Sequence, residues 1–460
     1  MSLLEAKKVH VIGIGGVGVS AVAKILSSRG VLVTGSDAEE SPLVEDVRAE
    51  GILVHVGHDA GNLPADADAI IYSGAVPASN AERVAAQDQN IPQFSYSEAL
   101  GEISKQYKTI AVSGTHGKST VTAMLGSILI AAGLDPLVLV GTRVKTLQHG
   151  NVHLGQGEWF VVEACEHEAQ MMKLSPTYIV VNNLESDHLD FYHSFEKLSE
   201  TFAEYVKKVA PQNCIVNADE SSVRKLFGEQ FAQTKSFGFS EFATATKIGA
   251  RHILDGAQNA EFFVGGEQKI LSLRIPGAFN VSNAAAAFTA AVAIGVSPDV
   301  ALAALDAYPG SWRRFERVGF VNGAPVISDY GHHPTAVNAT VQATKEFFPG
   351  RRVLLVYQPH QHHRTGSLYP EFVSALAAPD ALVLHEIYDV RGRERAEDQS
   401  VSSSQLLKDV AAARDGKPHW YAANLTEAAD LIRTHALPDD VVVVMGAGDI
   451  YKVAHEVCST

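Results

Sequence analysis

The chain of 460 residues has little of what several protein classes depend on. It contains three cysteines, Cys165, Cys214 and Cys458, and no Cys-x-x-Cys pair. This spacing argues against a disulfide framework and against a cysteine-ligated zinc site. No apolar run approaches 18 residues, and the first residues lack the pattern of a secretory signal. We therefore expect a soluble, cytoplasmic protein with no membrane partner.

Positive charge is also scarce, since 37 lysines and arginines stand against 52 acidic residues, and the net charge is −15. Without a basic run, this balance argues against nucleic acid and anionic membranes as partners. What is present is an ordinary globular composition, 46% hydrophobic and 19% charged. The length suggests about three domains at ~150 residues each.

Apolar, β-branched runs alternate with helical patterns along the chain, as at 9–12, 19–28 and 31–34, and again from 324 onward. Such alternation predicts an α/β fold with parallel sheets covered on both faces. We place the domain boundaries at 1–106, 107–311 and 312–460. A polar joint at 105–108 and the restart of the alternation near 312 set these limits.

The stretch from Gly114 to Ser119 reads Gly-Thr-His-Gly-Lys-Ser between an apolar run, 107–112, and a helical pattern, 120–133. A loop at such a junction points backbone N–H groups and a helix N-terminus at phosphates. Lys118 would reach the terminal phosphates of ATP, and Ser119 would bind Mg²⁺. The strict Walker A pattern lacks its first glycine here, and a glycine turn without a ligand is the alternative.

A second glycine loop, Gly13-Ile-Gly-Gly-Val-Gly18, follows an apolar run, and Asp37 comes about 20 residues later. Alone, this pattern is typical of NAD-dependent oxidoreductases. Together with an ATP-type loop it favours two phosphorylated ligands, ATP as the fuel and a nucleotide-tagged substrate. A tight turn with no ligand is again the alternative.

Acidic residues and an imidazole follow two apolar runs that we expect to be strands. Glu163 ends the first run, and Asp187 and His188 come after the second. The carboxyl ends of parallel strands meet at one edge, where ligands bind. Since Mg²⁺ prefers oxygen ligands, Ser119, Glu163 and, less typically, His188 could complete two metal positions. A solvated or helix-capping carboxylate is the alternative for Asp187.

Over essentially its full length the chain resembles the Mur ligases. The residues that carry the resemblance are Gly13-Ile-Gly-Gly16, Ser36-Asp37, Ser113-Gly-Thr-His-Gly-Lys-Ser119, Glu163-Ala-x-Glu166, Asp187-His188, Gly277-x-x-Asn280-x-x-Asn283-Ala-Ala, Arg313-Arg-Phe315, Asp329-Tyr-Gly-His-His-Pro334, Gln358-Pro-His360 and Gly446-Ala-Gly448. The branch it is most similar to adds L-alanine to UDP-N-acetylmuramate.

This resemblance implies a Rossmann-like N-terminal domain for the UDP-sugar and a central P-loop ATPase-like domain for ATP and Mg²⁺. It implies a Rossmann-like C-terminal domain that binds the amino acid and closes. The activity would be ATP-dependent, ADP-forming amide-bond formation through an acyl phosphate in peptidoglycan precursor synthesis. The alternatives are a related recycling ligase that attaches a peptide, or, from another class, an oxidoreductase. A monomer or homodimer is expected.

The resemblance also implies site residues. The UDP-sugar residues would be Gly13, Gly15, Gly16, Gly18, Ser36, Asp37 and Ser73. The ATP residues would be Gly114, Thr115, His116, Gly117, Lys118, Ser119, Thr120, Asn280, Asn283, Arg314 and Asp329. The magnesium ligands would be Ser119, Glu163 and His188. The amino-acid pocket would include Tyr330, His332, His333 and Arg364, and the catalytic groups would be Lys118, Arg314, His332, His333 and Arg364.

Several positions depart from the family pattern. Cys165 stands where an aspartate is typical, and Phe279 replaces a histidine beside the adenine. Gln361 replaces the first arginine of Pro-His-Arg-x-x-x-Arg, which leaves Arg364 as the second. These changes leave the acceptor open between L-alanine, another amino acid and a peptide. Later-step Mur ligases carry a carbamylated lysine where this chain has Phe202, which agrees with the alanine-adding branch. We expect Gln361→Arg to lower the KM for L-alanine.

Overall fold

The computed structural model describes residues 3–254, 256–389 and 401–458. They divide into two compact units. The first unit lies within Met1–Glu185, Glu196–Lys247 and Ala285–Ala304. The second lies within Ser186–Phe195, Ile248–Ala284 and Leu305–Thr460.

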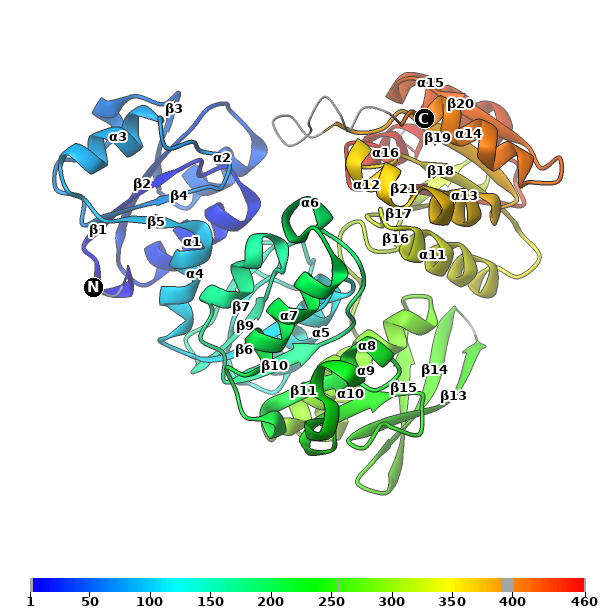
Figure 1. The fold of residues 1–460 in the computed structure, drawn as a ribbon, viewed down its shortest axis with the longest axis horizontal. Helices are drawn as coiled ribbons and strands as arrows, with labels where there is room; N and C mark the ends of the chain where they lie inside the picture. Colours follow the sequence, from blue (N-terminus) through cyan, green and yellow to red (C-terminus); the bar gives the residue numbers. More distant parts are fainter. Residues whose placement is uncertain (1–2, 255, 390–400, 459–460) are drawn as a thin grey trace. The chain divides into compact units, whose positions relative to one another are not determined.

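The first unit begins with a five-stranded sheet in the order β3-β2-β1-β4-β5, in which every pair of neighbours is parallel. Its strands are β1 (Lys8–Ile12), β2 (Leu32–Asp37), β3 (Leu53–Val56), β4 (Ala69–Tyr72) and β5 (Gln93–Ser95). Its helices are α1 (Val17–Ser28), α2 (Pro42–Ala49), α3 (Ala81–Asp88) and α4 (Tyr96–Ser104), drawn in blue in Figure 1. The sheet order reverses at β1, so the loop after β1 lies where such sheets bind ligands.

A ten-stranded sheet follows in the order β15-β14-β13-β12-β11-β10-β6-β9-β7-β8. Its strands are β6 (Lys108–Ser113), β7 (Leu137–Leu139), β8 (Val152–Leu154), β9 (Trp159–Glu163), β10 (Tyr178–Val181), β11 (Cys214–Asn217), β12 (Lys235–Gly238), β13 (Thr246–Leu254), β14 (Ala257–Val264) and β15 (Glu267–Leu273). Strands β7, β9, β6, β10, β11, β12 and β13 pair in parallel, whereas β7–β8 and β14–β15 are antiparallel.

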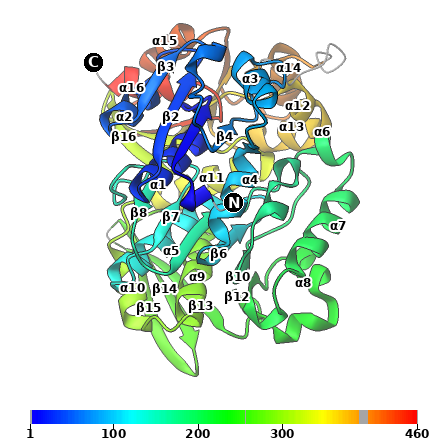
Figure 2. The same ribbon diagram turned by 90° about the vertical axis from the view of Figure 1, so that its left-hand side faces the viewer.

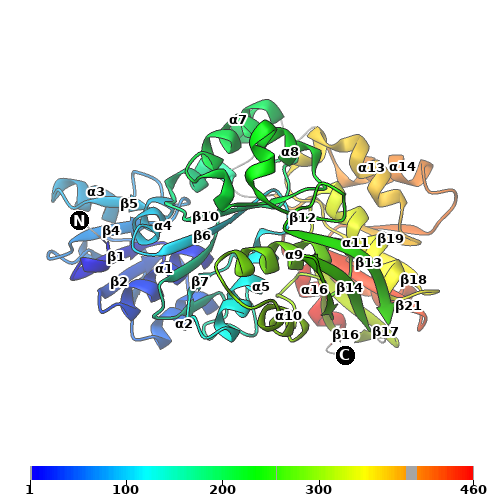
Figure 3. The same ribbon diagram turned by 90° about the horizontal axis from the view of Figure 1, so that it is seen from below.

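Helices cover both faces of the parallel part of this sheet. Figures 2 and 3 show α5 (Lys118–Ala131) on one face of it, and α7 (Phe195–Val206) and α8 (Ser221–Phe227) on the other. Strand β6 is central, and its residues Ile110, Ala111 and Val112 are fully buried. The segment after β6 therefore leaves the middle of a covered sheet. The remaining helices of this region are α9 (Ala278–Ala293) and α10 (Pro298–Asp306).

The second unit contains a six-stranded sheet in the order β16-β17-β21-β18-β19-β20, parallel except for β16–β17. Its strands are β16 (Glu316–Val321), β17 (Ala324–Asp329), β18 (Arg352–Tyr357), β19 (Ala381–His385), β20 (His419–Ala422) and β21 (Asp440–Met445). Its helices are α6 (Leu189–Tyr192), α11 (Pro334–Phe347), α12 (His362–Ser367), α13 (Tyr369–Ala377), α14 (Ser403–Ala412), α15 (Leu425–His435) and α16 (Tyr451–Cys458).

Strand β18 shows why this sheet has two cores. Val353, Leu355 and Tyr357 belong to a buried cluster with residues of α11, α13 and α14. Leu354 and Val356 belong to another cluster, with residues of α15 and α16. Since successive side chains of a strand point to opposite faces, a continuous apolar run produces this arrangement.

The predicted α/β class is confirmed, and the structure has strands where apolar runs predicted them, as at β1, β2 and β17. Two helices begin two residues earlier than the sequence predicted, at Val17 and at Lys118, because Gly16 and Gly117 are their N-cap residues and the glycine turns end there. Gly133 has a positive φ of 72° just after α5, as its predicted stop position requires. Among the described residues, none of the helices combines the length and the hydropathy needed to cross a membrane.

Candidate functional site

The loop between β1 and α1 is held against the end of β2. The N–H groups of Gly13 and Ile14 donate to the carbonyl of Ser36, at 2.8 and 3.0 Å. The N–H of Gly15 donates to Asp37 Oδ2 at 2.7 Å. Asp37 thus fixes the loop through its carboxylate, in addition to any contact it makes with a ribose.

Close neighbours leave no room for a side chain at Gly13 and Gly18 of this loop. A Cβ on Gly13 would lie 2.9 Å from Ser73 Cβ, so Ser73 lies beside the loop. A Cβ on Gly18 would lie 2.6 Å from the Tyr96 ring. Gly18 therefore lets α1 approach α4, and this packing favours a structural role for it over direct contact with a ligand.

Behind the loop is a buried polar network centred on Glu82. The Glu82 Oε2 atom accepts from Ser36 Oγ at 2.6 Å and lies 3.0 Å from His10 Nε2. Its Oε1 atom accepts from Asn62 Nδ2 at 3.0 Å. Burial would raise the pKa of Glu82, but the hydrogen bonds from His10, Ser36 and Asn62 outweigh it and lower that pKa to about 2. The Ser36 hydroxyl therefore donates to the buried Glu82 carboxylate, whereas the Ser36 carbonyl accepts from the glycine loop.

The loop between β6 and α5 has the conformation that the sequence predicted. Gly114 and Gly117 have φ values of 129° and 82°. The N–H of His116 donates to Asn183 Oδ1 at 2.7 Å, and both Asn182 and Asn183 donate to its carbonyl at 3.2 Å. Two asparagines after β10 thus hold a turn that opens directly into a helix N-terminus, the arrangement that binds phosphate.

Lys118 lies at the start of α5 and is folded over this loop. Its Nζ donates to the carbonyls of Gly114 and Thr115, at 2.6 and 3.2 Å, and to Glu166 at 2.9 Å. Burial is the largest single influence on the pKa of Lys118 and lowers it, but Glu166 and the neighbouring Cys165 and Glu163 together outweigh burial, so the pKa is raised overall. Lys118 is therefore a cation, and backbone carbonyls and one carboxylate hold it at the phosphate loop.

Ser119 and Glu163 come together beside Lys118. Ser119 Oγ donates to Glu163 Oε2 at 3.1 Å, and the N–H of Gly141 donates to Glu163 Oε1. A hydroxyl and a carboxylate are the donors that Mg²⁺ prefers, so these two residues fit the predicted ion. His188, the third predicted ligand, belongs to the second unit.

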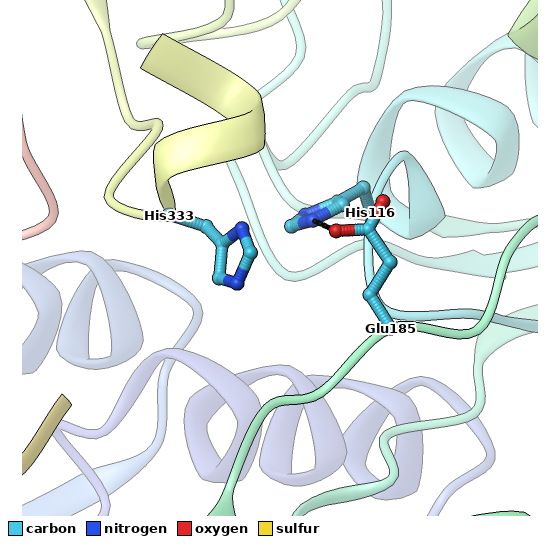
Figure 4. Close-up of side chains that lie close together, drawn as sticks. All are labelled: His116, Glu185 and His333. Carbon is cyan, nitrogen blue, oxygen red and sulfur yellow. Dashed lines mark ion pairs between the residues drawn. The ribbon is translucent and has the colours of Figure 1, made fainter. Parts of the chain in front are cut away.

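Thr115, His116 and Thr120 are the other residues of this region to which the sequence gave an ATP role. Figure 4 shows the ion pair between His116 and Glu185, whose Nε2 and Oε2 atoms lie 3.5 Å apart. Thr115 Oγ1 accepts from the N–H of Glu185 at 2.9 Å. Thr120 is buried in the first turn of α5. The side chains of Thr115 and His116 thus connect the loop to the segment that follows β10.

In the second unit, the predicted adenine residues Asn280 and Asn283 form a pair on α9. Asn283 Nδ2 donates to Asn280 Oδ1 at 3.1 Å, and Asn280 Nδ2 donates to the carbonyl of Pro276 at 2.7 Å. Both side chains are buried. A hydrogen bond within the protein thus orients the side-chain amide of each asparagine.

The two arginines of Arg313-Arg314 have different environments. Arg313 is buried, donates to the carbonyls of Gly446 and Gly448, and has its guanidinium 4.5 Å from the Tyr451 ring centre. Arg314 has its guanidinium 4.8 Å from the Tyr330 ring centre. Arg313 therefore connects two loops of the second unit, and Arg314 is the arginine of the pair to which an ATP role can be given.

Asp329 ends β17 and connects two further turns. Its Oδ2 accepts from the N–H of Phe315 at 2.8 Å and its Oδ1 from the N–H of Gly331 at 2.7 Å. Burial raises the pKa of Asp329, although both hydrogen bonds oppose this. Asp329 thus positions the chain on either side of Arg314 and His332.

The adjacent histidines His332 and His333 are not equivalent. The His333 Nδ1 atom accepts from the N–H of Thr335 at 3.3 Å, so this side chain caps α11. The His332 ring lies 5.7 Å from the His360 ring, which stacks on Tyr388 at 5.6 Å. Burial and the Arg364 charge hold the pKa of His332 well below its usual range. Near neutral pH, His332 is therefore a neutral imidazole.

Arg364 lies in α12 and is 9% exposed. Its Nε and Nη2 atoms donate to Asp187 Oδ1 at 3.2 and 3.0 Å. Its Nη1 donates to Gln361 Oε1 at 3.0 Å and lies 3.2 Å from His360 Nδ1. Burial by itself would raise the pKa of Asp187, but the Arg364 charge and the smaller contributions of its other neighbours together hold that pKa well below its usual range. The sequence left open whether the Asp187 carboxylate is solvated or caps a helix. It does neither, because it is buried and paired with Arg364.

Three family models match consecutive parts of the chain. The Mur ligase family catalytic domain matches residues 8–108, the Mur ligase middle domain 112–291, and the Mur ligase glutamate ligase domain 313–448. The chain belongs to the Mur ligase family. The predicted boundaries at 106 and 311 lie close to the gaps between these matches.

Curated relatives of this Mur ligase are similar over nearly their whole length. A protein from Clostridium novyi (strain NT) named UDP-N-acetylmuramate–L-alanine ligase is 36% identical over 452 residues, which cover 97% of this chain and 96% of that one. A protein of the same name from Chlorobaculum tepidum is 36% identical over 460 residues, with coverage of 99% and 95%.

Solved structures agree with the fold. A crystal structure of UDP-N-acetylmuramate-alanine ligase from Thermotoga maritima matches with a TM-score of 0.81 at 28% identity and covers 98% of each chain. A murein peptide ligase from Psychrobacter arcticus matches with a TM-score of 0.70 at 23% identity, also over 98% of each chain. The second likeness supports the fold alone.

The sequence predicted no role for Glu166 or Glu82 and gave Gln361 only as a departure from the family pattern, yet all three contact residues of the predicted sites. Glu166 was part of a quoted motif, and its spacing of three from Glu163 was the available signal. For Gln361 the sequence shows only that a family arginine is missing, whereas in the structure its amide oxygen accepts a hydrogen bond from Arg364. Glu82 gave no signal, since it lies in the polar stretch Ala81-Glu-Arg83 that reads as a solvated helix start.

Proposed function

We propose that this Mur ligase joins L-alanine to UDP-N-acetylmuramate, with conversion of ATP to ADP and phosphate, as a step of peptidoglycan precursor synthesis. The observation that carries the proposal is the set of curated relatives with this name, at 32–36% identity over 97–99% of the chain. The three domains proposed for this activity span 1–106, 107–311 and 312–460.

The reaction proceeds in two balanced steps. An oxygen of the sugar carboxylate attacks the γ-phosphorus of ATP, and ADP leaves, which gives an acyl phosphate. The alanine nitrogen then attacks the acyl carbon, phosphate leaves, and the nitrogen loses a proton. No protein nucleophile is needed, so the protein contributes mainly positioning and charge.

The phosphate loop supplies the charge for the first step. Lys118 moves from Glu166 to the γ-phosphate, and Arg314 adds a second cation against the equatorial oxygens. Ser119 and Glu163 hold Mg²⁺, with His188 as the further proposed ligand. When bound, Mg²⁺ offsets negative charge on the phosphates. Asn280 and Asn283 face the adenine, and Asp329 keeps the turn before His332 in place.

Between the two histidines we propose His332 as the proton acceptor for the amine in the second step, because the His333 Nδ1 atom already accepts from the N–H of Thr335. Gly13, Gly15 and Gly16 hold the diphosphate of the UDP-sugar, with Asp37 and Ser73 beside them. We propose that Arg364 binds the amino acid through its carboxylate.

The test is phosphate release from ATP with UDP-N-acetylmuramate present, with L-alanine compared with a tripeptide. We expect L-alanine to support turnover and the tripeptide to give less than about a tenth of that rate. Faster turnover with the tripeptide would replace the proposal with the recycling activity. NADH binding without any phosphate release would favour the oxidoreductase alternative. Lys118→Ala is the negative control, and Lys197→Ala, at an exposed lysine of α7, is its matched control.

A further inference from the structure

Gln361 has a strained backbone that the surrounding chain holds in place. Its φ is 69° and its ψ 131°, a conformation that non-glycine residues rarely adopt. Its N–H donates to the carbonyl of Tyr388 at 3.0 Å. Its own carbonyl accepts from the N–H of Thr365 at 3.1 Å and from the Thr365 hydroxyl at 2.8 Å. These three hydrogen bonds fix the start of α12.

The strained residue directs its side chain onto Arg364. Gln361 Oε1 accepts from Arg364 Nη1 at 3.0 Å, and the carbonyl of His360 is a longer acceptor of the same nitrogen at 3.4 Å. The opposite edge of the guanidinium, formed by Nε and Nη2, faces a carboxylate oxygen of Asp187. Because Gln361 engages Nη1, the edge of the guanidinium formed by Nε and Nη2 faces the Asp187 carboxylate.

The chemistry of the contact matters as much as its geometry. An amide oxygen accepts a hydrogen bond without cancelling the positive charge of its partner. A carboxylate at position 361 would compete with any other anion for the guanidinium, and a second guanidinium would repel it. A planar guanidinium holds a carboxylate through two parallel bonds only when the correct edge faces it.

We propose that Gln361 is a positioning residue that turns the Nε–Nη2 edge of Arg364 toward the carboxylate of the incoming amino acid. In the absence of that substrate, the Asp187 carboxylate occupies this edge, and the amino acid takes its place. This role rests on the proposed function, because it gives Arg364 the substrate carboxylate as its ligand. It also reverses the expectation from the sequence, since an arginine at 361 would remove the acceptor and add a like charge.

Gln361→Glu is the decisive variant because it has the same shape and adds a negative charge. We expect the KM for L-alanine to rise about tenfold, with the KM for ATP and the KM for UDP-N-acetylmuramate changed by less than about twofold. The kcat at saturating L-alanine should stay within about threefold. A role confined to the fold of α12 would lower kcat or stability without such selectivity. Gln233→Glu, at an exposed glutamine, is the matched control.

Two more variants separate the explanations. Gln361→Asn shortens the side chain without adding charge, so its KM for L-alanine should lie between those of the wild type and Gln361→Glu. Gln361→Arg should raise that KM as well. If the wild type turns over L-alanine and all three variants keep its KM, the inference is wrong and the proposed function stands. If the wild type shows no turnover with L-alanine, the proposed function itself fails. Should Gln361→Glu not fold, as judged by circular dichroism, Gln361→Asn decides.

Discussion

Lys118 and Glu166 form an ion pair over the phosphate loop, with the lysine Nζ 2.9 Å from the carboxylate. Glu166 is 1% exposed, and Lys118 also contacts two loop carbonyls. The cation proposed for the γ-phosphate is therefore already engaged by an anion inside the protein. In the proposed function ATP would take the place of that anion, so we expect the pair to influence nucleotide affinity.

Replacement of the cation tests the ATP site directly. Lys118→Ala should lower kcat by a factor on the order of 10²–10⁴, because a charge aimed at the developing negative charge is lost. Phosphate release is the measurement, and circular dichroism should show an unchanged fold. Turnover within a factor of two of the wild type would mean that the loop does not bind the γ-phosphate.

Replacement of the anion should act in the opposite direction on binding. Glu166→Gln keeps an acceptor beside Lys118 but removes the charge that competes with phosphate, so ATP should bind roughly three- to tenfold more tightly. Titration calorimetry with ATP in the absence of UDP-sugar measures this. Glu204→Gln, at an exposed glutamate of α7, is the control. Weaker ATP binding would show that the Glu166 carboxylate supports the nucleotide and does not compete with it.

The close approach of Gly18 to Tyr96 gives a prediction for the first loop. A Cβ at position 18 would lie 2.6–2.8 Å from three atoms of the phenol ring, so Gly18→Ala should displace α1 or the ring. We expect a several-fold higher KM for UDP-N-acetylmuramate and a smaller change in the KM for ATP. Gly30→Ala, at a glycine with no neighbour within 4 Å but with a positive φ that Gly18 lacks, shows what backbone strain without a steric contact does to the two KM values. Equal effects on both KM values would assign the contact to general stability.

The Glu82 network gives a prediction about pH. The pKa of Glu82 is lowered from 4.5 to about 2, so the folded state favours the ionised carboxylate. This stabilisation, on the order of 3 kcal/mol, is fully present above pH 4.5 and is lost as the pH falls toward 2. Glu82→Gln should therefore lower the free energy of unfolding at pH 7, and its deficit relative to the wild type should shrink below pH 4.5.

Urea denaturation at a series of pH values measures this difference. Glu200→Gln, at an exposed glutamate paired with Lys197, should show almost no deficit at any pH. A deficit for Glu82→Gln that is the same at pH 7 and pH 3 would mean that shape, and not charge, accounts for the role of Glu82.

The sequence by itself determined the local elements of this protein. Runs of β-branched residues predicted strands such as β6 and β9, since a strand buried on both faces needs a continuous apolar segment. Glycines at 114 and 117 predicted a phosphate loop, because such turns need backbone conformations that glycine adopts most easily. Lys118 and Ser119 were found in the same way, from a motif whose chemistry is contained in six consecutive residues.

Only the tertiary structure decided which side chains meet across the chain. Glu166 lies 48 residues from Lys118, and Asp187 lies 177 residues from Arg364, and no local pattern encodes either distance. The same holds for His332 and His333, neighbours in sequence with one beside Arg364 and the other capping α11. Burial, pKa and hydrogen-bond partners depend on what packs around a residue, and packing is set by the whole fold.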